Sequence, residues 1–224
     1  MNYSEEEIAL GRAIIETCRD LERRGLNQGT SGNVSVRLGA GLEDGFLITP
    51  TAMPYDVMQP EDMAHMRFNG GHAGRRPPSS EWRFHFDIYR TRPEAGAVIH
   101  THSGYATTLA CLRRDIPAFH YMIALFGGAP IRCGDYATYG TQELSDIVVK
   151  SLEGRSAALL GNHGLVVIGP TLRRALALTV EAETLAMMYW RALQLGEPRL
   201  LSDAEIARVR KKFEGYGDYG PAKK

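Results

Sequence analysis

The stretch that most constrains the fold spans residues 78–102, where a helical pattern is followed by a β-branched strand. Ser79 and Ser80 are expected to begin the helix, which continues to about Arg90. Residues 97–102 read Ala-Val-Ile-His-Thr-His, a run typical of a strand. Strands and helices alternate on both sides of this stretch, which predicts a layered α/β domain. Periodicity alone does not order its strands.

The rest of the chain contains no internal repeat and no linker that divides it. Helical patterns cover residues 4–25, 103–112, 142–152 and 171–195 and the segment from residue 202, and strand patterns cover residues 33–36, 45–49 and 157–168. Residues 69–78, rich in Gly, Arg and Pro, are expected to form an exposed loop. We therefore expect a single domain over residues 1–224, with a mobile tail from about residue 214.

The charge and the cysteine content argue against several classes of protein. The chain of 224 residues has 26 basic and 26 acidic side chains, and a net charge of zero argues against binding to nucleic acid or to a membrane surface. Cys18, Cys111 and Cys133 are widely spaced and odd in number, which favours a reducing compartment over a disulfide framework. The acidic start at Glu5 and the lack of an apolar run of spanning length predict a soluble cytoplasmic protein.

Two histidines on the predicted strand are candidate metal ligands. Side chains two residues apart project from the same side of a strand, so His100 and His102 can reach one ion. Imidazole suits Zn²⁺ and neighbouring first-row metals. Alone, a His-x-His pair is more often a hydrogen-bonded pair of half-buried histidines, so further ligands are needed to define a metal site.

Glu81 and His163 supply what this pair lacks. Glu81 is expected in the first turn of the helix, where an acid usually just favours the helix dipole. His163 lies at the junction of two short strands within residues 157–168. With His100 and His102 they make a three-histidine site with a spare carboxylate, and a catalytic metal needs three protein ligands and an exchangeable position. The remaining histidines lack comparable pairing: His85, His120 and the two expected at the surface, His65 and His72.

Three segments offer neutral hydrogen-bond donors for a ligand. The first is a glycine-rich turn that lets the backbone approach a ligand closely, although alone it reads as a hairpin turn and lacks both common phosphate fingerprints. The second is a strand end, and the third is a helix N-terminus, which is a ready anion site. The donors in these segments are Thr30, Ser31, Asn33, Thr49, Thr51, Ser79 and Ser80.

Five short motifs make the sequence recognisable. They are Gly29-Thr30-Ser31-Gly32-Asn33-Val34-Ser35, Thr49-Pro50-Thr51, Pro78-Ser79-Ser80-Glu81, His100-Thr101-His102 and Gly161-Asn162-His163-Gly164. Their order and approximate spacing resemble those of the class II aldolase/adducin family, and the resemblance covers essentially the whole chain. Within this family the chain is most similar to the aldolases that cleave ketose 1-phosphates.

The resemblance implies a fold, an assembly and a metal. The fold is a three-layer αβα sandwich with a central, mostly antiparallel sheet, assembled as a homotetramer with active sites between subunits. The metal is Zn²⁺, with Mn²⁺ or Co²⁺ as alternatives, held by His100, His102 and His163. Glu81 is a fourth ligand in the empty enzyme and becomes the acid/base when substrate displaces it.

The resemblance also implies residues that bind the substrate. The phosphate group is expected to lie among residues with neutral donors: Gly32, Asn33, Thr51, Ser79 and Ser80. Ala52 stands where the family has glycine, and its backbone N–H can still donate. Tyr121, reaching from a neighbouring subunit, matches the residue that handles the aldehyde oxygen, and Tyr216 matches a tail tyrosine that closes over a neighbour's site. Tyr139 replaces a phenylalanine associated with the aldehyde pocket.

The implied reaction is the reversible cleavage of a ketose 1-phosphate into dihydroxyacetone phosphate and an aldehyde. Breaking a C–C bond beside a ketone needs an electron sink, either a lysine Schiff base or a metal acting as Lewis acid. The metal is favoured because the lysines are expected in a surface helix or near the C-terminus: Lys150, Lys211, Lys212, Lys223 and Lys224. The candidate substrates are L-fuculose 1-phosphate, 5-deoxyribulose 1-phosphate and 5-methylthioribulose 1-phosphate.

Other functions of the same scaffold stay open. They are a methylthioribulose-1-phosphate dehydratase, a decarboxylase of phosphorylated sugar acids and a ribulose-5-phosphate epimerase. A non-catalytic, adducin-like scaffolding role is disfavoured because the three histidines and Glu81 are all present.

Overall fold

The helices and strands of the computed structural model follow one another in the predicted alternation. The structure describes residues 3–39 and 44–214, so Tyr216 and the rest of the predicted tail lie outside the described residues. The α-helices are α1 (Glu5–Arg23), α2 (Trp82–Thr91), α3 (Gly104–Cys111), α4 (Gln142–Ser151), α5 (Leu172–Leu195) and α6 (Asp203–Phe213), with 3₁₀ turns at η1 (Pro60–Asp62) and η2 (Tyr121–Phe126). The strands are β1 (Asn33–Arg37), β2 (Phe46–Ile48), β3 (Ala64–Met66), β4 (His72–Ala73), β5 (Ala97–Thr101), β6 (Arg132–Gly134), β7 (Ala157–Leu160) and β8 (Gly164–Gly169).

The strands of the described chain form one eight-stranded sheet in the order β4-β3-β2-β1-β5-β8-β7-β6. Neighbouring strands are antiparallel except for β6 and β7, which are parallel. The prediction of a mostly antiparallel sheet is therefore confirmed. β5 lies inside the sheet, with β1 and β8 as its neighbours, and this order brings distant motifs together at the end of β5.

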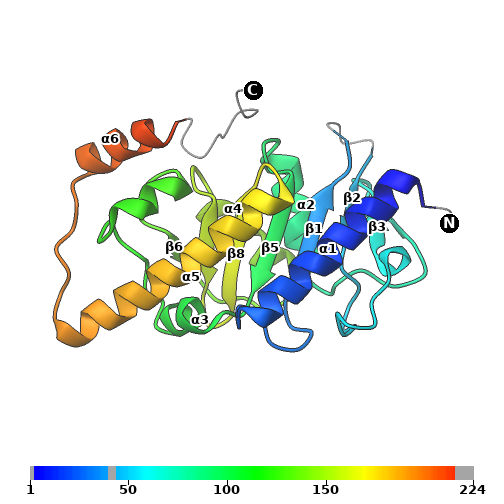
Figure 1. Cartoon of the computed structure of the whole chain (residues 1–224), viewed down its shortest axis with the longest axis horizontal. Coiled ribbons are helices and arrows are strands. Elements are labelled where there is room, and N and C mark those ends of the chain that lie inside the picture. Colours follow the sequence, from blue (N-terminus) through cyan, green and yellow to red (C-terminus); the bar gives the residue numbers. More distant parts are fainter. Residues whose placement is uncertain (1–2, 40–43, 215–224) are drawn as a thin grey trace, which may run out of the picture.

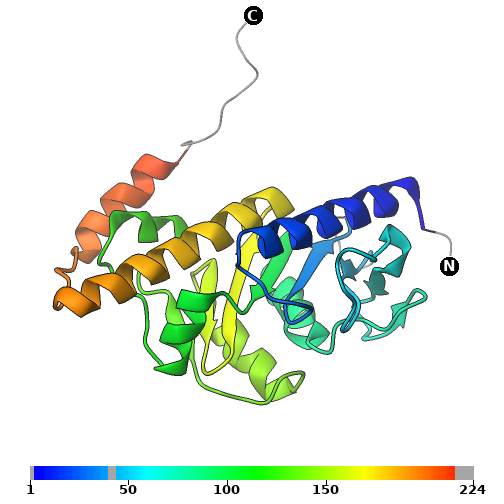
Figure 2. The same ribbon diagram turned by 60° about the horizontal axis from the view of Figure 1, so that its bottom comes forward.

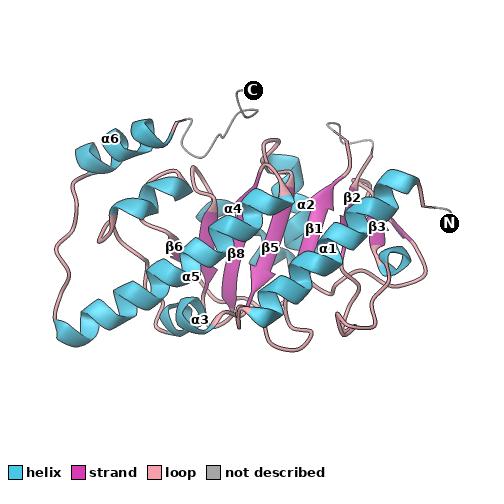
Figure 3. Ribbon diagram, in the orientation of Figure 1, coloured by secondary structure: helices cyan, strands magenta, loops and turns pink. Residues whose placement is uncertain are grey.

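Helices cover both faces of the sheet (Figures 1 and 2). α1 and α5 lie side by side across one face, and α2 and α4 pack together on the other. Side chains alternate along β5: Ala97 and Ile99 join the apolar cluster beneath α1, whereas Val98 joins the cluster formed with α2 and α4. Figure 3 shows the strands as a layer between helices, which confirms the three-layer αβα sandwich.

The ends of the helices agree with the sequence signals, with one shift. Ser4 and Glu7 form a capping box at the start of α1, and Ser202 caps α6 by accepting a hydrogen bond from the backbone N–H of Glu205. α2 begins at Trp82, later than the predicted start at the two preceding serines, so Glu81 occupies the N-cap position instead of the first turn. This shift leaves its side chain free to point into the site.

α6 lies at one end of the molecule, apart from the sheet, and packs on η2 (Figure 1). The ring of Phe213, the last residue of α6, stacks 6.2 Å from the ring of Tyr121 in η2. The described residues that follow reach only to Glu214. Within the described ranges, no helix is both long and apolar enough to cross a membrane.

Candidate active site

Three histidines meet at the end of β5. His100 is the fourth residue of that strand, His102 follows its last residue, and His163 lies in the turn that joins β7 to β8. Because Thr101 of β5 pairs with Leu165 of β8, the turn before β8 lies beside the end of β5. The three ring centroids are 4.8, 4.9 and 5.0 Å apart, so the predicted grouping of these histidines is present.

The nitrogens of these rings are arranged as metal ligands would be. The Nε2 atoms of His100 and His102 are 3.1 Å apart, close to the roughly 3.3 Å expected for two imidazoles on one tetrahedral zinc ion. Nδ1 of His100 lies 3.0 Å from the carbonyl oxygen of Leu165, to which it donates, so Nε2 carries the free lone pair. Burial and the neighbouring imidazoles lower the pKa of His102 to about 4, which keeps that ring neutral at pH 7.

Glu81 completes the group. Its residue is only 5% exposed, and its carboxylate lies 3.3 Å from Nε2 of His100 and 3.1 Å from Nε2 of His163. Burial raises the pKa of this carboxyl, but the two imidazoles outweigh burial and hold the pKa well below its usual range. The Nδ2 of Asn33 donates to Oε2 at 2.9 Å, whereas Oε1 is buried and accepts no hydrogen bond of good geometry.

These observations test whether a divalent cation fits. Three imidazole nitrogens within 4.8 Å of one another, next to a buried carboxylate oxygen that lacks a hydrogen bond, are the donor set that zinc prefers. In the described chain, no other group of three histidine, cysteine or carboxylate side chains is placed in this way. The residues present therefore fit a divalent metal ion.

The group opens onto a cavity of about 460 Å³. Hydroxyl groups dominate its polar lining, and no described lysine or arginine takes part in that lining. The cavity is lined by Thr30, Ser31, Thr51, Ala52, Ser80, Glu81, His102, Tyr136, Ala137, Tyr139, Asn162 and His163. An anionic ligand in this cavity would thus be held by neutral donors, as the sequence predicts for the phosphate group.

The other predicted substrate residues lie behind the cavity lining. Asn33 and Ser79 are buried, and each contacts Glu81: Asn33 through its side-chain amide and Ser79 through Oγ, which accepts from the backbone N–H of Glu81 at 3.3 Å. A Cβ on Gly32 would come within 2.5 Å of the Asn27 amide and 2.6 Å of the carbonyl oxygen of His100, so this position needs glycine.

Of the two tyrosines predicted to act from a neighbouring subunit, only Tyr121 is among the described residues. Tyr121 is 48% exposed on η2 and does not line this cavity, and Tyr216 lies outside the described residues. Their predicted roles therefore stay predictions. Sequence analysis missed Tyr136 and Asn162, both of which line the cavity. For Asn162, the glycines on either side of the Asn162-His163 pair were a signal in the sequence. For Tyr136, the sequence offers no comparable motif.

The remaining histidines have contacts of another kind. His85, expected to lack a pairing comparable to that of the candidate metal ligands, is fully buried and contacts both Asn33 and Ser35. Its partners lie on a distant strand, so no local pattern indicates them. His65, expected at the surface, has a side chain that is only 15% exposed and lies 3.1 Å from Glu7, whereas His72 is exposed.

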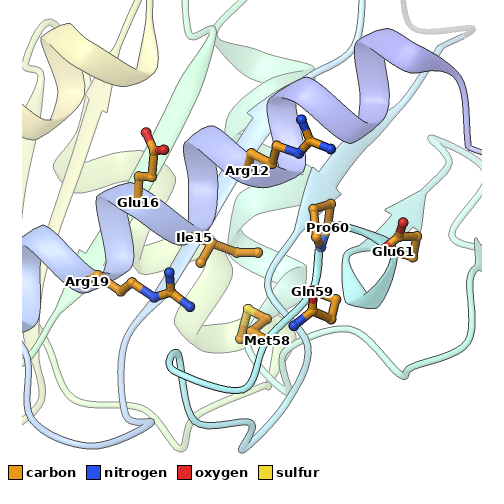
Figure 4. Close-up of a pocket in the computed structure, with 8 residues that line it drawn as sticks. All are labelled: Arg12, Ile15, Glu16, Arg19, Met58, Gln59, Pro60 and Glu61. Carbon is orange, nitrogen blue, oxygen red and sulfur yellow. The ribbon is translucent and has the colours of Figure 1, made fainter.

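A second cleft, of about 300 Å³, lies between α1 and the segment around η1 (Figure 4). Its lining contains no histidine or cysteine. Arg19 of α1, which lines this cleft, donates hydrogen bonds to the carbonyl oxygens of Tyr55 and Asp56, both at 3.1 Å. Arg19 thus holds α1 on the neighbouring loop, and the lining of the cleft does not repeat the arrangement of the histidine site.

Fold and site together define a three-layer αβα protein with a three-histidine candidate metal centre. The family profile described as Class II Aldolase and Adducin N-terminal domain matches residues 12–190. The chain belongs to this family.

Individual relatives agree with the family match. The chain is 50% identical to a 5-methylthioribulose-1-phosphate/5-deoxyribulose-1-phosphate aldolase of Rhodospirillum rubrum, over 94% of each chain. It is 48% identical to an L-fuculose phosphate aldolase of Escherichia coli, over 95% of this chain and 97% of the relative. A solved structure of an L-fuculose 1-phosphate aldolase superposes with a TM-score of 0.89 at 38% identity, covering 95% of this chain and 98% of that one.

Proposed function

We propose that this chain is a class II aldolase, a lyase that uses a divalent metal to cleave a ketose 1-phosphate reversibly into dihydroxyacetone phosphate and an aldehyde. The observation that carries the proposal is the Glu81 carboxylate, held against two of the three histidines at a cavity lined with hydroxyl donors. The names of the two relatives support the substrate class.

His100, His102 and His163 hold the ion, with Glu81 as a fourth ligand before substrate arrives. The ion is Zn²⁺, or Mn²⁺ or Co²⁺ in its place. A bound divalent cation supplies a Lewis acid, which stabilises the negative charge left beside the ketone when the C–C bond breaks.

The protein residues supply binding and proton transfer. The phosphate group lies against three segments. Thr51, Ala52 and Ser80 line the cavity there, and Gly32, Asn33 and Ser79 lie directly behind that lining. Tyr121 of a neighbouring subunit takes the proton from the hydroxyl at the cleaved bond. Glu81, which takes up a proton from water once substrate has displaced it, gives that proton to the ketone fragment. Tyr139 lies on the aldehyde side, and Tyr216 of a neighbour closes the site.

This scheme places the active site between subunits of a homotetramer, each a single domain of 1–224. Support comes from Tyr121, which is exposed and does not line the cavity of its own chain. We also propose that the protein works in the cytoplasm, because Cys111 is an exposed free thiol, which is suited to a reducing compartment.

The test is release of dihydroxyacetone phosphate from L-fuculose, 5-deoxyribulose and 5-methylthioribulose 1-phosphates. Glu81→Gln should lower the rate about 10²–10⁴-fold, as expected for the loss of an acid/base group. Chelator treatment should abolish release, and added Zn²⁺ should restore it. Glu94→Gln is the matched control, since this mostly exposed carboxylate just beyond α2 lies outside the site and should leave the rate unchanged.

The products separate the alternatives. Consumption of substrate without dihydroxyacetone phosphate would contradict the aldolase and favour the dehydratase, decarboxylase or epimerase. Absence of bound metal together with absence of turnover would favour the adducin-like scaffold. Among the three substrates, we expect activation free energies that differ by about 1–3 kcal/mol at most, because apolar pockets discriminate weakly between small groups.

A further inference from the structure

α2 and β1 face each other through two rows of polar side chains. Glu81, His85 and Tyr89 recur every four residues and so share one side of α2 and its N-cap. Asn33 and Ser35 alternate along β1 and share the face toward α2. Four helical residues rise about 6 Å and two strand residues about 6.7 Å, so the two rows stay in step.

The facing side chains form a continuous chain of hydrogen bonds. Asn33 donates from Nδ2 to Oε2 of Glu81 at 2.9 Å, and its Oδ1 lies 2.5 Å from Nε2 of His85. Nδ1 of His85 lies 2.6 Å from Oγ of Ser35, which lies 2.8 Å from the hydroxyl of Tyr89. All five residues are buried, so each polar group depends on the next one for its partner.

The carboxylate of Glu81 determines which atom donates and which accepts in each of these hydrogen bonds. An ionised carboxylate only accepts, so the NH₂ of Asn33 must face Glu81 and its Oδ1 must face His85. His85 therefore donates from Nε2, and its Nδ1 accepts from Ser35, whose oxygen in turn accepts from Tyr89. Burial, and then the nearby His100, lower the pKa of His85 to about 3, which agrees with a neutral ring that donates from one nitrogen and accepts at the other.

We infer that His85 is a positioning residue for Glu81. It holds the Asn33 amide in the orientation that presents Nδ2 to Oε2, and this contact keeps the carboxylate between His100 and His163. His85 itself is fully buried and does not line the cavity, so it acts only through Asn33. The inference rests on the proposed role of Glu81 as metal ligand and acid/base.

Two substitutions at His85 separate positioning from packing. His85→Leu removes the donor and leaves Oδ1 of Asn33 free to turn toward Glu81. His85→Gln keeps an N–H donor near the place of Nε2. We expect kcat of His85→Leu to fall about 10–100-fold with KM changed less than about twofold, as for other residues that orient a metal ligand, and His85→Gln to recover most of the loss.

Ile88→Ala is the matched control. Ile88 lies on the same helix and is fully buried, but it is outside the hydrogen-bond chain, so its loss should lower stability and leave kcat unchanged. If His85→Gln or Ile88→Ala lowers kcat as much as His85→Leu does, the effect is general packing and the inference is wrong.

A second measurement does not depend on turnover. Competition with a chelator gives the Zn²⁺ dissociation constant of each variant, and we expect about tenfold weaker binding for His85→Leu than for wild type and His85→Gln. If the wild type shows no aldolase activity, the proposed function fails while this comparison still tests the positioning of Glu81. Wild-type Zn²⁺ affinity in His85→Leu would overturn the inference.

Discussion

At the scale of single residues, Ala52 has a backbone conformation that favours glycine. Its φ is +51°, and it lines the cavity beside Thr51. A non-glycine residue in the left-handed region is destabilised by about 1–2 kcal/mol. Glycine avoids this strain but loses about 0.5–1 kcal/mol more conformational entropy on folding. Ala52→Gly should therefore stabilise the fold by about 0.5–1 kcal/mol and raise Tm by about 1–4 °C, measured by thermal unfolding.

Ala137 provides the control for this prediction. It lines the same cavity and is buried, but it is not among the described non-glycine residues with positive φ. Ala137→Gly should lower the free energy of unfolding by about 0.5–1 kcal/mol. A Tm that falls in both variants would show that the conformation of Ala52 is not strained.

The same scale shows why sequence analysis found some site residues and missed others. His100 and His102 were found because strand periodicity puts neighbours two residues apart on one side. His85 is 52 residues from its partner Asn33, and nothing in its own helix indicates that pairing. Beside His85, the buried positions of α2 are Phe84, Ile88 and Tyr89, whereas Trp82 is only partly buried.

At the scale of elements, α3 is held by a side chain from another helix. Ser103 occupies its N-cap position but makes no capping hydrogen bond. Glu183 of α5 accepts hydrogen bonds from the backbone N–H groups of Tyr105 and Ala106 and from Oγ of Ser103, at 2.7–2.9 Å. Because α3 begins two residues after His102, this cap also helps to fix the chain that leaves the end of β5.

Glu183→Ala should therefore lower the free energy of unfolding by about 1.5–3 kcal/mol, since it leaves the N–H and O–H donors at the start of α3 without their charged partner. Urea unfolding measures this loss as a lower midpoint with an unchanged slope. Glu181→Ala, two residues earlier on the same helix and also partly buried, should cost clearly less. Equal losses in the two variants would contradict the capping role.

The element scale also shows how far local signals reach. The caps at Ser4 and Ser202 were predictable because each partner lies three residues away. The cap of α3 was not, because Glu183 lies 77 and 78 residues from the N–H groups it accepts from. Local patterns therefore located α3 but could not identify what holds its N-terminus.

At the scale of the whole molecule, the metal should contribute to stability. The proposed ligands come from β5, the turn before β8 and the start of α2, so an ion would tie separate elements together. At a free Zn²⁺ concentration of about 100 times Kd, binding adds about 2.7 kcal/mol, or roughly 5–10 °C in Tm for a chain of this size. Chelator should remove this increment, and added Zn²⁺ should restore it.

His163→Ala should abolish the response of Tm to Zn²⁺, because it removes one of three imidazole ligands. His65→Ala keeps all three and should respond as wild type does. A Tm that is independent of both chelator and Zn²⁺ in the wild-type protein would contradict the proposed metal site.

The sequence by itself determined what depends on local periodicity and on short motifs. The alternation of strands and helices, the pair His100 and His102, and the turn at His163 were all predicted, and the motif order indicated the family that the comparisons confirm. These features need only neighbouring residues, whose geometry the backbone dictates directly.

Only the tertiary structure showed how the distant groups of the predicted site are brought together. The antiparallel pairing of β5 with β1 and β8 sets Asn33 opposite His100 and brings His163 beside the same strand end. The late start of α2 then turns Glu81 into this group, 48 residues from Asn33. Such contacts depend on strand order and register. The residue pattern of a single strand does not specify either one, because strand pairing depends on how the whole sheet packs between its two helical layers.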